Sequence, residues 1–349
     1  MAEENNKATG CPLPLSNYPR ILLAHGGGGR LMHQLIDEIF RASFDNPDLE
    51  TGHDGAILGW SGNKLVFTTD SYVVDPLFFP GGDIGMLAVY GTVNDLAMCG
   101  ARPRYLSASF IIEEGLPVET LRMVAESMHR AAVEAGIAIV TGDTKVVEHG
   151  HGHGVFINTA GAGSLEHDRY IHPSKVVPGD VVIINGDIGR HGIAVMSARE
   201  GMQFETEIES DLAPLAATVA RLMENGVEIH CLRDLTRGGL ATGLIEIAQT
   251  GKVSVVIEEK SIPVSGPVRG ACEMLGYDPL YIANEGRFVC LVPEKDSGRT
   301  IEIMRSLSWP ATIIGRVGEG QLGLVTMIGA IGAERIIDML SGEQLPRIC

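Results

Sequence analysis

The stretch that decides the fold is residues 65–100, which read LVFTTDSYVVDPLFFPGGDIGMLAVYGTVNDLAMCG. Its opening residues are β-branched or apolar and predict a strand that ends at Asp70. Asp83 suits a helix N-cap, because its carboxylate can accept hydrogen bonds from the first backbone N–H groups of a helix. Apolar residues at helical spacing follow, and Gly100 marks the predicted helix end. The stretch therefore predicts a strand followed by a capped helix.

The rest of the chain repeats this alternation on both sides of a polar, proline-punctuated hinge at 165–179. Before the hinge we expect strands at 105–112, 137–140 and 155–160, and a helix that Pro117 opens and Gly136 ends. After it we expect strands at 181–184, 253–257, 288–292, 311–317 and 322–327, with helices at 191–200, 215–224, 240–249 and 333–340. The expected fold class is α/β (α+β). Its expected parts are a tail at 1–20, domains at 21–168 and 169–332, and a helix with a cysteine-bearing tail at 333–349.

Charge and cysteine usage narrow the class of protein. The 349 residues hold 27 basic and 44 acidic side chains, a formal net charge of −17. Such a surface repels phosphate backbones and anionic lipid, so we expect neither nucleic acid nor a membrane as partner. A bound polyphosphate would need metal ions or a local basic pocket. The six cysteines form no CxxC pair and the start of the chain is polar, which is typical of reduced thiols in a cytoplasmic protein.

Two glycine-rich segments carry possible binding chemistry. The run Gly26–Gly29 precedes an expected helix, where backbone N–H groups could cradle phosphate, although such runs are also common in linkers. His149, His151 and His153 alternate with glycine, which could put three imidazoles on one face of a strand as a zinc site. A mobile polar loop is the favoured interpretation, because the sequence fixes no carboxylate to orient the imidazoles.

Aspartates beside small polar residues at the ends of expected elements are the stronger signal. Carboxylate oxygens in that setting suit Mg²⁺ carrying a polyphosphate. Each one singly is more often a helix cap or turn residue, and their spacing forms no named metal motif. The candidates are Asp54, Asp70, Asp83, Asp95, Asp143 and Asp234.

The chain ends in Pro346-Arg347-Ile348-Cys349. Prenylation needs a cysteine fourth from the end, so that interpretation fails. A thiol at the tip of a short tail is a sterically free nucleophile, whose α-carboxylate disfavours the thiolate while Arg347 partly offsets this effect. An incidental terminus is the competing interpretation.

Taken together, several strings resemble the HypE family of hydrogenase maturation proteins, within the aminoimidazole-ribonucleotide-synthetase-like ATP-binding superfamily. The superfamily also includes selenophosphate synthetase, and the terminal string is the one that selects HypE. The resemblance runs from about His25 to Cys349. Its strings are Thr68-Thr69-Asp70, 78–85 (FFPGGDIG), 91–98 (GTVNDLAM), 141–146 (TGDTKV), 234–239 (DLTRGG), Asn284-Glu285-Gly286 and 346–349 (PRIC).

The resemblance implies a two-domain, aminoimidazole-ribonucleotide-synthetase-like fold with a flexible C-terminal tail, and ATP and Mg²⁺ as cofactors. It implies that HypF places a carbamoyl group on the terminal thiol and that the enzyme uses ATP to dehydrate this thiocarboxamide to a thiocyanate. The cyanide then goes to iron held by a HypC–HypD complex, for [NiFe] hydrogenase. It also implies a homodimer formed through the N-terminal halves, with ATP near that interface.

The resemblance also assigns roles to single positions. Cys349 would carry the carbamoyl group, with Glu285 and Lys145 around the thiocarboxamide. The glycine loop would close over the phosphates through Gly27, Gly28 and Gly29. The remaining assignments are Asp54, Asp70, Asp95 and Asp234 to Mg²⁺, and Asp83, Asn94, Asp143 and Thr236 to the nucleotide.

Two other functions stay open on the sequence. One is a selenophosphate-synthetase-like or other small-molecule ATP enzyme, which would need a nucleophile near the glycine loop. Cys11 is the thiol nearest to that loop and lies well upstream of it. The other is a non-catalytic scaffold for maturation factors, which ATP turnover dependent on a carbamoylated tail would exclude.

Overall fold

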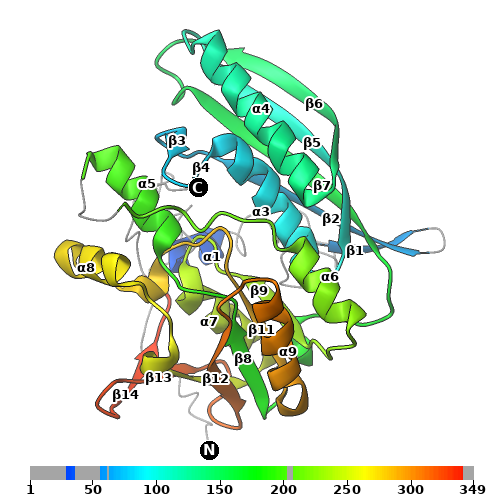
Figure 1. The fold of residues 1–349 in the computed structure, drawn as a ribbon, viewed down its shortest axis with the longest axis vertical. Helices are drawn as coiled ribbons and strands as arrows, with labels where there is room; N and C mark the ends of the chain where they lie inside the picture. Colours follow the sequence, from blue (N-terminus) through cyan, green and yellow to red (C-terminus); the bar gives the residue numbers. More distant parts are fainter. Residues whose placement is uncertain (1–28, 36–55, 61–62, 203–206, 341–349) are drawn as a thin grey trace, which may run out of the picture.

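The computed structural model describes residues 29–35, 56–60, 63–202 and 207–340. Two lobes, each built on its own sheet, lie one above the other in the view of Figure 1. In the described ranges, no helix is both long enough and apolar enough to cross a lipid bilayer.

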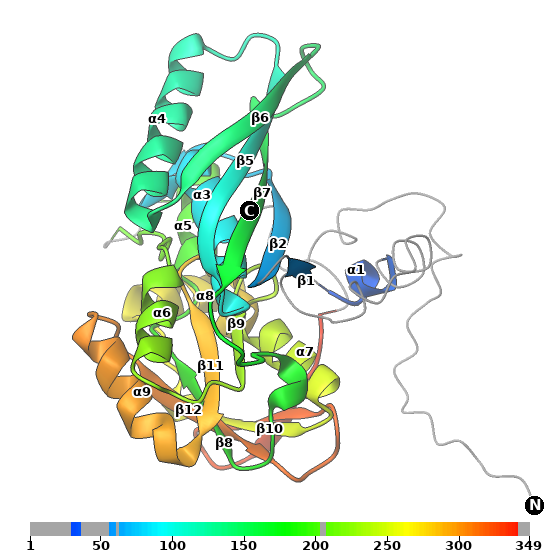
Figure 2. The ribbon, with the colours of Figure 1, turned by 90° about the vertical axis from the view of Figure 1, so that its right-hand side faces the viewer.

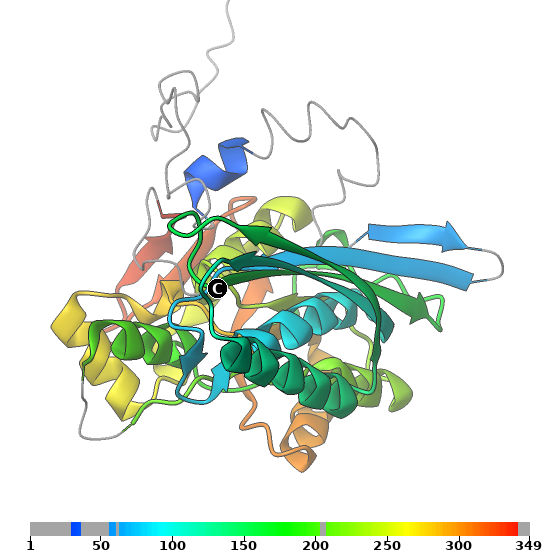
Figure 3. The ribbon, with the colours of Figure 1, turned by 90° about the horizontal axis from the view of Figure 1, so that it is seen from above.

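The first lobe is a five-stranded sheet with helices on one face (Figures 2 and 3). The sheet order is β1-β2-β7-β5-β6, in which β5 and β6 are parallel and the other neighbours antiparallel. The strands are β1 (Ala56–Trp60), β2 (Asn63–Tyr72), β5 (Arg102–Glu113), β6 (Ala138–Val147) and β7 (Val155–Leu165). The covering helices are α3 (Ile84–Met98) and α4 (Val118–Ala135).

Local signals in the sequence account for both helices. The Asp83 carboxylate caps α3 by accepting hydrogen bonds from the N–H groups of Gly85 and Met86, as expected. The helix α4 follows Pro117 and ends at Gly136, whose φ of 69° lies in the left-handed region that favours glycine. Both helices bury their apolar side chains against the sheet, and within the described residues no helix covers the other face of this sheet in the same way.

The second lobe is a seven-stranded sheet with cores on both faces. Its order is β14-β13-β10-β12-β8-β11-β9. Successive residues of β8 alternate between the cores: Val182 and Ile184 pack with α7, and Val181 and Ile183 with α6 and α9. The strands are β8 (Asp180–Ile184), β9 (Cys231–Asp234), β10 (Ser254–Glu258), β11 (Phe288–Pro293), β12 (Thr312–Gly318), β13 (Val325–Ile328) and β14 (Glu334–Ile337). The helices are α5 (Arg190–Glu200), α6 (Ala216–Glu224), α7 (Gly239–Gly251), α8 (Gly266–Leu275) and α9 (Glu294–Ser306).

Short elements complete the described chain. The helix α1 (Arg30–Leu35) begins at a hydrogen bond from the N–H of Arg30 to the carbonyl of Leu340, 3.1 Å long, which ties the two ends of the described chain together. The others are β3 (Phe78–Phe79), β4 (Gly82–Asp83) and the 3-10 turns η5 (Pro173–Lys175), η6 (Glu259–Ser261) and η7 (Pro279–Tyr281).

Two sequence-based expectations about elements are wrong. The helix expected at 333–340 is the strand β14, which pairs antiparallel with β13 and buries Ile337 while Ile336 points to solvent. Thr141-Gly142-Asp143 lies inside β6 rather than after a strand, because β6 continues alongside β5 to Val147. The sequence analysis also missed β1, β9, α8 and α9.

Candidate active site

A cavity of about 130 Å³ lies where the two lobes meet. It gathers residues from the end of β2, from α3, from the connection between β9 and α7, and from the loop before β11. The lining residues are Asp70, Ser71, Tyr72, Val73, Gly91, Asp95, Asp234, Thr236, Arg237 and Glu285. The structure thus brings together Asp70, Asp95, Asp234, Thr236 and Glu285, which the sequence singled out as separate strings.

Arg237 is the basic residue among those that line this acidic cavity, and the sequence analysis did not assign it. Its Nη2 donates to Asp70 Oδ1 at 3.1 Å, so it joins the second lobe to the first. Its φ of 49° is in the left-handed region, which for a non-glycine residue is uncommon and is associated with functional sites. The pairing partly offsets the repulsion between carboxylates in the cavity.

The helix α3 and the strand β2 fix the wall that carries Asp95. Thr68 Oγ1 donates to Asp95 Oδ2 at 3.1 Å. Behind it, the Tyr72 hydroxyl lies 3.1 Å from Thr92 Oγ1, beside Gly91. A side chain at Gly91 would collide with that tyrosine, because its Cβ would lie 2.4 Å from the hydroxyl oxygen. Burial, and then the negative charge of Asp70, raise the pKa of Tyr72 well above its usual value, so its hydroxyl stays protonated.

Glu285 is the most buried carboxyl group of the cavity lining, with 3% of the residue exposed. Burial raises its pKa well above the ordinary value, and the charges of Asp234, Asp70 and Asp211 raise it further, while Arg237 acts in the opposite direction. A carboxyl group tuned in this way holds a proton more strongly than a solvated one, which is typical of acid–base residues.

The cavity lining offers carboxylates that could hold a metal ion together with other ligands. Among the residues that the structure describes, no three His, Cys, Asp or Glu side chains converge closely enough to hold a metal by themselves. Mg²⁺ commonly binds through one or two carboxylates while substrate phosphates and water supply the other oxygens. Asp70, Asp95 and Asp234 offer such carboxylates on the walls of one cavity.

Asp83 and Asn94 lie outside the cavity lining and make structural contacts. Besides capping α3, the Asp83 carboxylate accepts from Ser127 Oγ at 2.5 Å, and the residue is 8% exposed. The Asn94 amide donates to the carbonyls of Ala213 and Glu285, and its oxygen accepts from the N–H of Leu215. Asn94 therefore binds the second lobe to α3 and positions the loop of Glu285.

Asp143 and Lys145 are also absent from the cavity lining. Both stand on β6, an exposed edge strand, where Lys145 Nζ lies 2.8 Å from Asp143 Oδ2. The hydrogen bond from Lys145 lowers the pKa of Asp143. Strand register aligns Asp143 with Ser109 on β5 and Asn158 on β7, so β5 and β7 separate it from β2.

Other candidates lie at or beyond the limits of the described residues. Gly27, Gly28, Asp54 and Cys349 lie outside them. Gly29 is described, and its carbonyl accepts the N–H of His33 at 3.2 Å, the first hydrogen bond of α1.

The histidine-rich loop binds a carboxylate through its backbone. Glu113 accepts hydrogen bonds from the N–H groups of Gly150 and Gly154, at 2.6 and 3.0 Å, and these contacts lower its pKa. His149 Nδ1 lies 3.7 Å from Glu113 Oε1. His149, His151 and His153 do not form a metal cluster in this described segment.

Sequence reasoning also missed two residues behind the cavity, Asp211 and Arg287. Arg287 follows directly after the Asn284-Glu285-Gly286 string, so its position was a usable signal. Asp211 lies in the irregular connection between α5 and α6, and no local pattern marks it.

Comparison with protein families matches both lobes. The family described as "AIR synthase related protein, N-terminal domain" matches residues 52–165, and "AIR synthase related protein, C-terminal domain" matches residues 177–327. The chain is therefore an AIR-synthase-related protein with the expected two-domain fold. A thiamine monophosphate kinase from Aquifex aeolicus shares this fold at 17% identity, with a TM-score of 0.65 over 89% of this chain and 99% of that one.

Closer relatives define the family. Carbamoyl dehydratase HypE of Rhizobium leguminosarum bv. viciae is 50% identical over 333 residues, covering 95% of each chain. The HypE of Azotobacter vinelandii is 49% identical over 94% of this chain and 96% of its own. The chain belongs to the HypE family of carbamoyl dehydratases, and it is an enzyme of that class.

Solved structures agree with this assignment. A crystal structure of a HypE–HypF complex contains a chain 49% identical to this one, with a TM-score of 0.84 over 88% of this chain and 99% of that chain. A HypE crystal structure in complex with ATP is 47% identical, with a TM-score of 0.79 over 95% of this chain and all of its own.

Proposed function

We propose that this protein dehydrates a carbamoyl group carried on its own Cys349, using ATP. The carbonyl oxygen of the thiocarboxamide attacks the γ-phosphorus of ATP, and the bond from that phosphorus to the ADP oxygen breaks. The carbon–oxygen bond then breaks, so the oxygen leaves with the phosphoryl group as inorganic phosphate. The nitrogen gives up both hydrogens as protons, and a thiocyanate remains on the sulfur. Phosphorylation makes a poor leaving group into a good one.

The observation that carries this proposal is the shared cavity at the junction of the lobes. Asp70, Asp95 and Asp234 would hold Mg²⁺, which neutralises the phosphate charge when it is bound. Thr236 lies beside them with a hydroxyl that can bind a phosphate oxygen. ATP is a polyanion and the protein carries a net charge of −17, so an acidic cavity of this kind suits ATP only together with the cation.

Glu285 is our candidate for the base that takes the nitrogen protons. It faces the cavity from the second lobe, on a loop that Asn94 holds against α3. Lys145 would stabilise charge around the thiocarboxamide, although within one chain it stands on the far edge strand β6.

A homodimer would explain that placement. The face of the first sheet that α3 and α4 leave open carries exposed apolar side chains, among them Phe67, Tyr105 and Ile111 at 44, 56 and 46%. Its edge strand β6 is unpaired on one side within the described chain. Exposed edges and apolar faces of this size favour a two-fold partner. We propose that a second copy covers this face and that ATP lies near the interface, close to Asp143 and Lys145.

The proposed partners follow from the chemistry of the terminal thiol. A HypF protein would supply the carbamoyl group, in line with the HypE–HypF complex of a relative. A HypC–HypD complex would accept the cyanide. Of the buried cysteines, Cys272 is a poor carrier, because burial raises the pKa of its thiol to about 11.

The test is intact mass after incubation with HypF, carbamoyl phosphate and ATP. We expect the mass to rise by one carbamoyl group and then to fall by one water. Cys349→Ala should keep Mg-ATP binding and acquire neither adduct, while Cys272→Ala serves as the matched control and should react like the wild type. A Cys349→Ala protein that still gains the cyano mass would refute the proposal. Full ATP turnover in that variant would instead favour a small-molecule ATP enzyme.

A further inference from the structure

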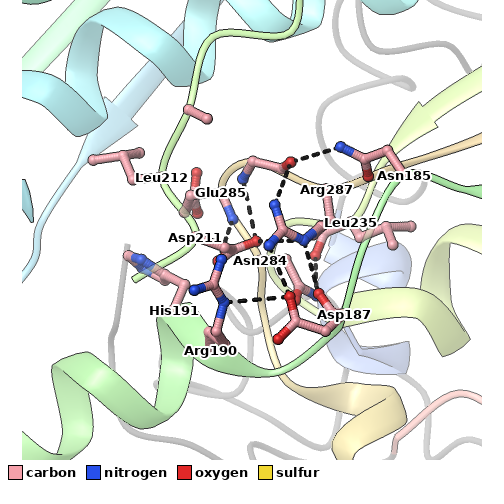
Figure 4. Close-up of polar contacts among 12 residues, drawn as sticks. Asn185, Asp187, Arg190, His191, Asp211, Leu212, Leu235, Asn284, Glu285 and Arg287 are labelled. Atoms are coloured by element: carbon pink, nitrogen blue, oxygen red, sulfur yellow. Dashed lines mark hydrogen bonds and ion pairs between the residues drawn. The ribbon is translucent and has the colours of Figure 1, made fainter. Parts of the chain in front are cut away.

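The loop that carries Glu285 is held through its backbone by side chains from other elements (Figure 4). The N–H groups of Glu285 and Gly286 both point at the carboxylate of Asp211, with N···O distances of 3.4 Å each. On the opposite side, the carbonyl of Glu285 accepts from Asn94 Nδ2 at 3.3 Å, and that of Gly286 accepts from Asn185 Nδ2 at 3.0 Å. The backbone polar groups of these two residues are thus bound by side chains distant in sequence.

Asp211 is the buried acceptor of this arrangement. The residue is 3% exposed, and it lies on the connection between α5 and α6. Its neighbour Ser210 fixes that connection through one backbone contact and one side-chain contact. The N–H of Ser210 donates to the carbonyl of Pro80 at 2.8 Å, and its hydroxyl lies 2.8 Å from His191 Nδ1. The connection therefore crosses from the first lobe to the loop of Glu285.

Arg287 supplies the countercharge. Its Nε lies 3.8 Å from Asp211 Oδ2, and its Nη1 donates to the carbonyl of Gly286 at 3.1 Å. Asp187 fixes the guanidinium from the other side, because its carbonyl accepts from Nε and its carboxylate from Nη2, both at 2.8 Å. Figure 4 shows Asp187, Arg287 and Asp211 side by side behind the loop.

Such an arrangement is difficult to explain by stability alone. Burying charges is costly, and well-packed apolar side chains often stabilise a core as well as a buried ion pair does. Apolar side chains cannot, however, accept hydrogen bonds from two consecutive N–H groups. Such hydrogen bonds fix the position and orientation of the residues that donate them. A base must be held close to its target, since misplacement by about 1 Å can cost about 10²-fold in rate.

We propose that Asp211, supported by Arg287, is a positioning residue that holds the carboxyl group of Glu285 in the cavity wall. Its catalytic consequence rests on the proposed function, in which Glu285 is the base. Asp211 is absent from the cavity lining, so it acts on the reaction through Glu285 and its loop rather than by contact with the substrate.

The first measurement needs no reaction. Backbone amide exchange of the full-length protein should show protected N–H groups at Glu285 and Gly286, and Asp211→Asn should speed their exchange by about tenfold or more. Arg287→Lys is the second variant, in case Asp211→Asn does not fold. The control is Asp180→Asn, since Asp180 is a distant carboxylate, 1% exposed, that also accepts a backbone N–H and contacts the imidazole of His230.

The second measurement is single-turnover dehydration of the carbamoylated protein. Asp211→Asn should slow the loss of water by about tenfold or more, with carbamoylation and Mg-ATP affinity unchanged. In a Glu285→Gln background the same substitution should cause no further slowing, because a residue that acts through another gives a non-additive cycle. Asp180→Asn should lower stability and keep the dehydration rate.

Unchanged exchange at Glu285 and Gly286, or equal slowing in both backgrounds, would overturn the positioning role. A wild-type protein that never converts the carbamoyl adduct would refute the proposed function instead. A normal rate in Glu285→Gln would refute the proposed base. In either of those cases the exchange measurement alone decides whether Asp211 holds the loop.

Discussion

Replacing Gly286 with alanine should disable the proposed chemistry without changing the identity of any residue that lines the cavity. Gly286 lies next to Glu285, at the point where the loop passes the connection between α5 and α6. A Cβ added there would stand 1.9 Å from the carbonyl oxygen of Asp211 and 3.0 Å from the N and Cβ of Ala213. Most of these atoms belong to the backbone, so a rotamer change cannot relieve the collision.

The overlap between the added Cβ and the carbonyl oxygen of Asp211 determines how far Glu285 must move and therefore how much dehydration should slow. Real Cβ atoms essentially never approach another heavy atom to less than 3.0 Å, so the loop or the Asp211 segment must move by at least 3.0 − 1.9 = 1.1 Å. A shift of that size displaces Glu285, and we expect dehydration to slow by about 10²-fold. Overpacking of a buried site also costs about 1–3 kcal/mol of unfolding free energy.

Gly270 offers a matched control. It lies inside α8, and a Cβ there meets no heavy atom within 4 Å. Gly270→Ala should therefore raise the unfolding free energy by about 0.5–1 kcal/mol, since alanine is the better helix former. Urea unfolding gives the stability of both variants, and intact mass after a single turnover gives their dehydration rates.

The two glycine substitutions should thus change stability in opposite directions, and only Gly286→Ala should slow the reaction. Dehydration at the wild-type rate in Gly286→Ala, with Mg-ATP binding unchanged, would refute the reasoning that the loop position limits the chemistry. Equal destabilisation in Gly270→Ala would show that the clearances around these glycines do not predict their effects.

Asp95→Asn should weaken Mg-ATP binding by about 1–3 kcal/mol, the scale of a lost charged contact, and unchanged affinity in calorimetry would remove Asp95 from the site. Light scattering should give a dimer mass at micromolar concentration, and Tyr105→Glu on the open sheet face should give monomers. A monomeric wild type with intact ATP turnover would contradict the dimer. The hydrogen bond to Asp180 raises the pKa of His230 above its ordinary value of 6.5. The charged pair therefore contributes fully below that pH, and its stabilisation is lost as the pH rises through the folded-state pKa. Urea unfolding from about pH 5 to 8, the range in which histidine usually changes charge, should show this decline and a flatter profile in His230→Gln.

The helices that the sequence predicts best are those whose ends are marked by capping or helix-terminating residues. The helix α3 has an aspartate cap and α4 lies between Pro117 and Gly136, so each boundary is specified within a few residues of itself. The error at 333–340 has the opposite cause. A run such as Ile336-Ile337 suits either a helix or a strand, and pairing with β13 decides the outcome. That pairing depends on where another strand lies, which no local window contains.

The same distinction between local signals and contacts of distant segments applies to the residues of the candidate site. Asp70, Asp95, Asp234 and Glu285 could be proposed because each stands in a recognisable string, and the fold brings them to one cavity. Asp211 could not be proposed, since its contacts with the loop join positions 74 and 75 residues apart and its surroundings follow no regular element. The carboxylates that line the cavity therefore stand in local strings, whereas the residue that holds the loop does not.

Asn94 and Asp95 show how closely the two kinds of residue can stand. They are consecutive on α3, and they serve different neighbours. Asn94 is 2% exposed, and its side-chain amide makes hydrogen bonds with the backbone of Ala213, Leu215 and Glu285. These hydrogen bonds hold the second lobe against α3. Asp95 lines the cavity at the junction of the two lobes. A cavity between lobes keeps its shape only if the lobes are held together, and here a residue that holds them stands directly beside a residue that lines the cavity. The Asn-Asp string therefore joins a side chain that holds the lobes together to one that we propose binds Mg²⁺, and the first contributes to the defined geometry of the acidic cavity.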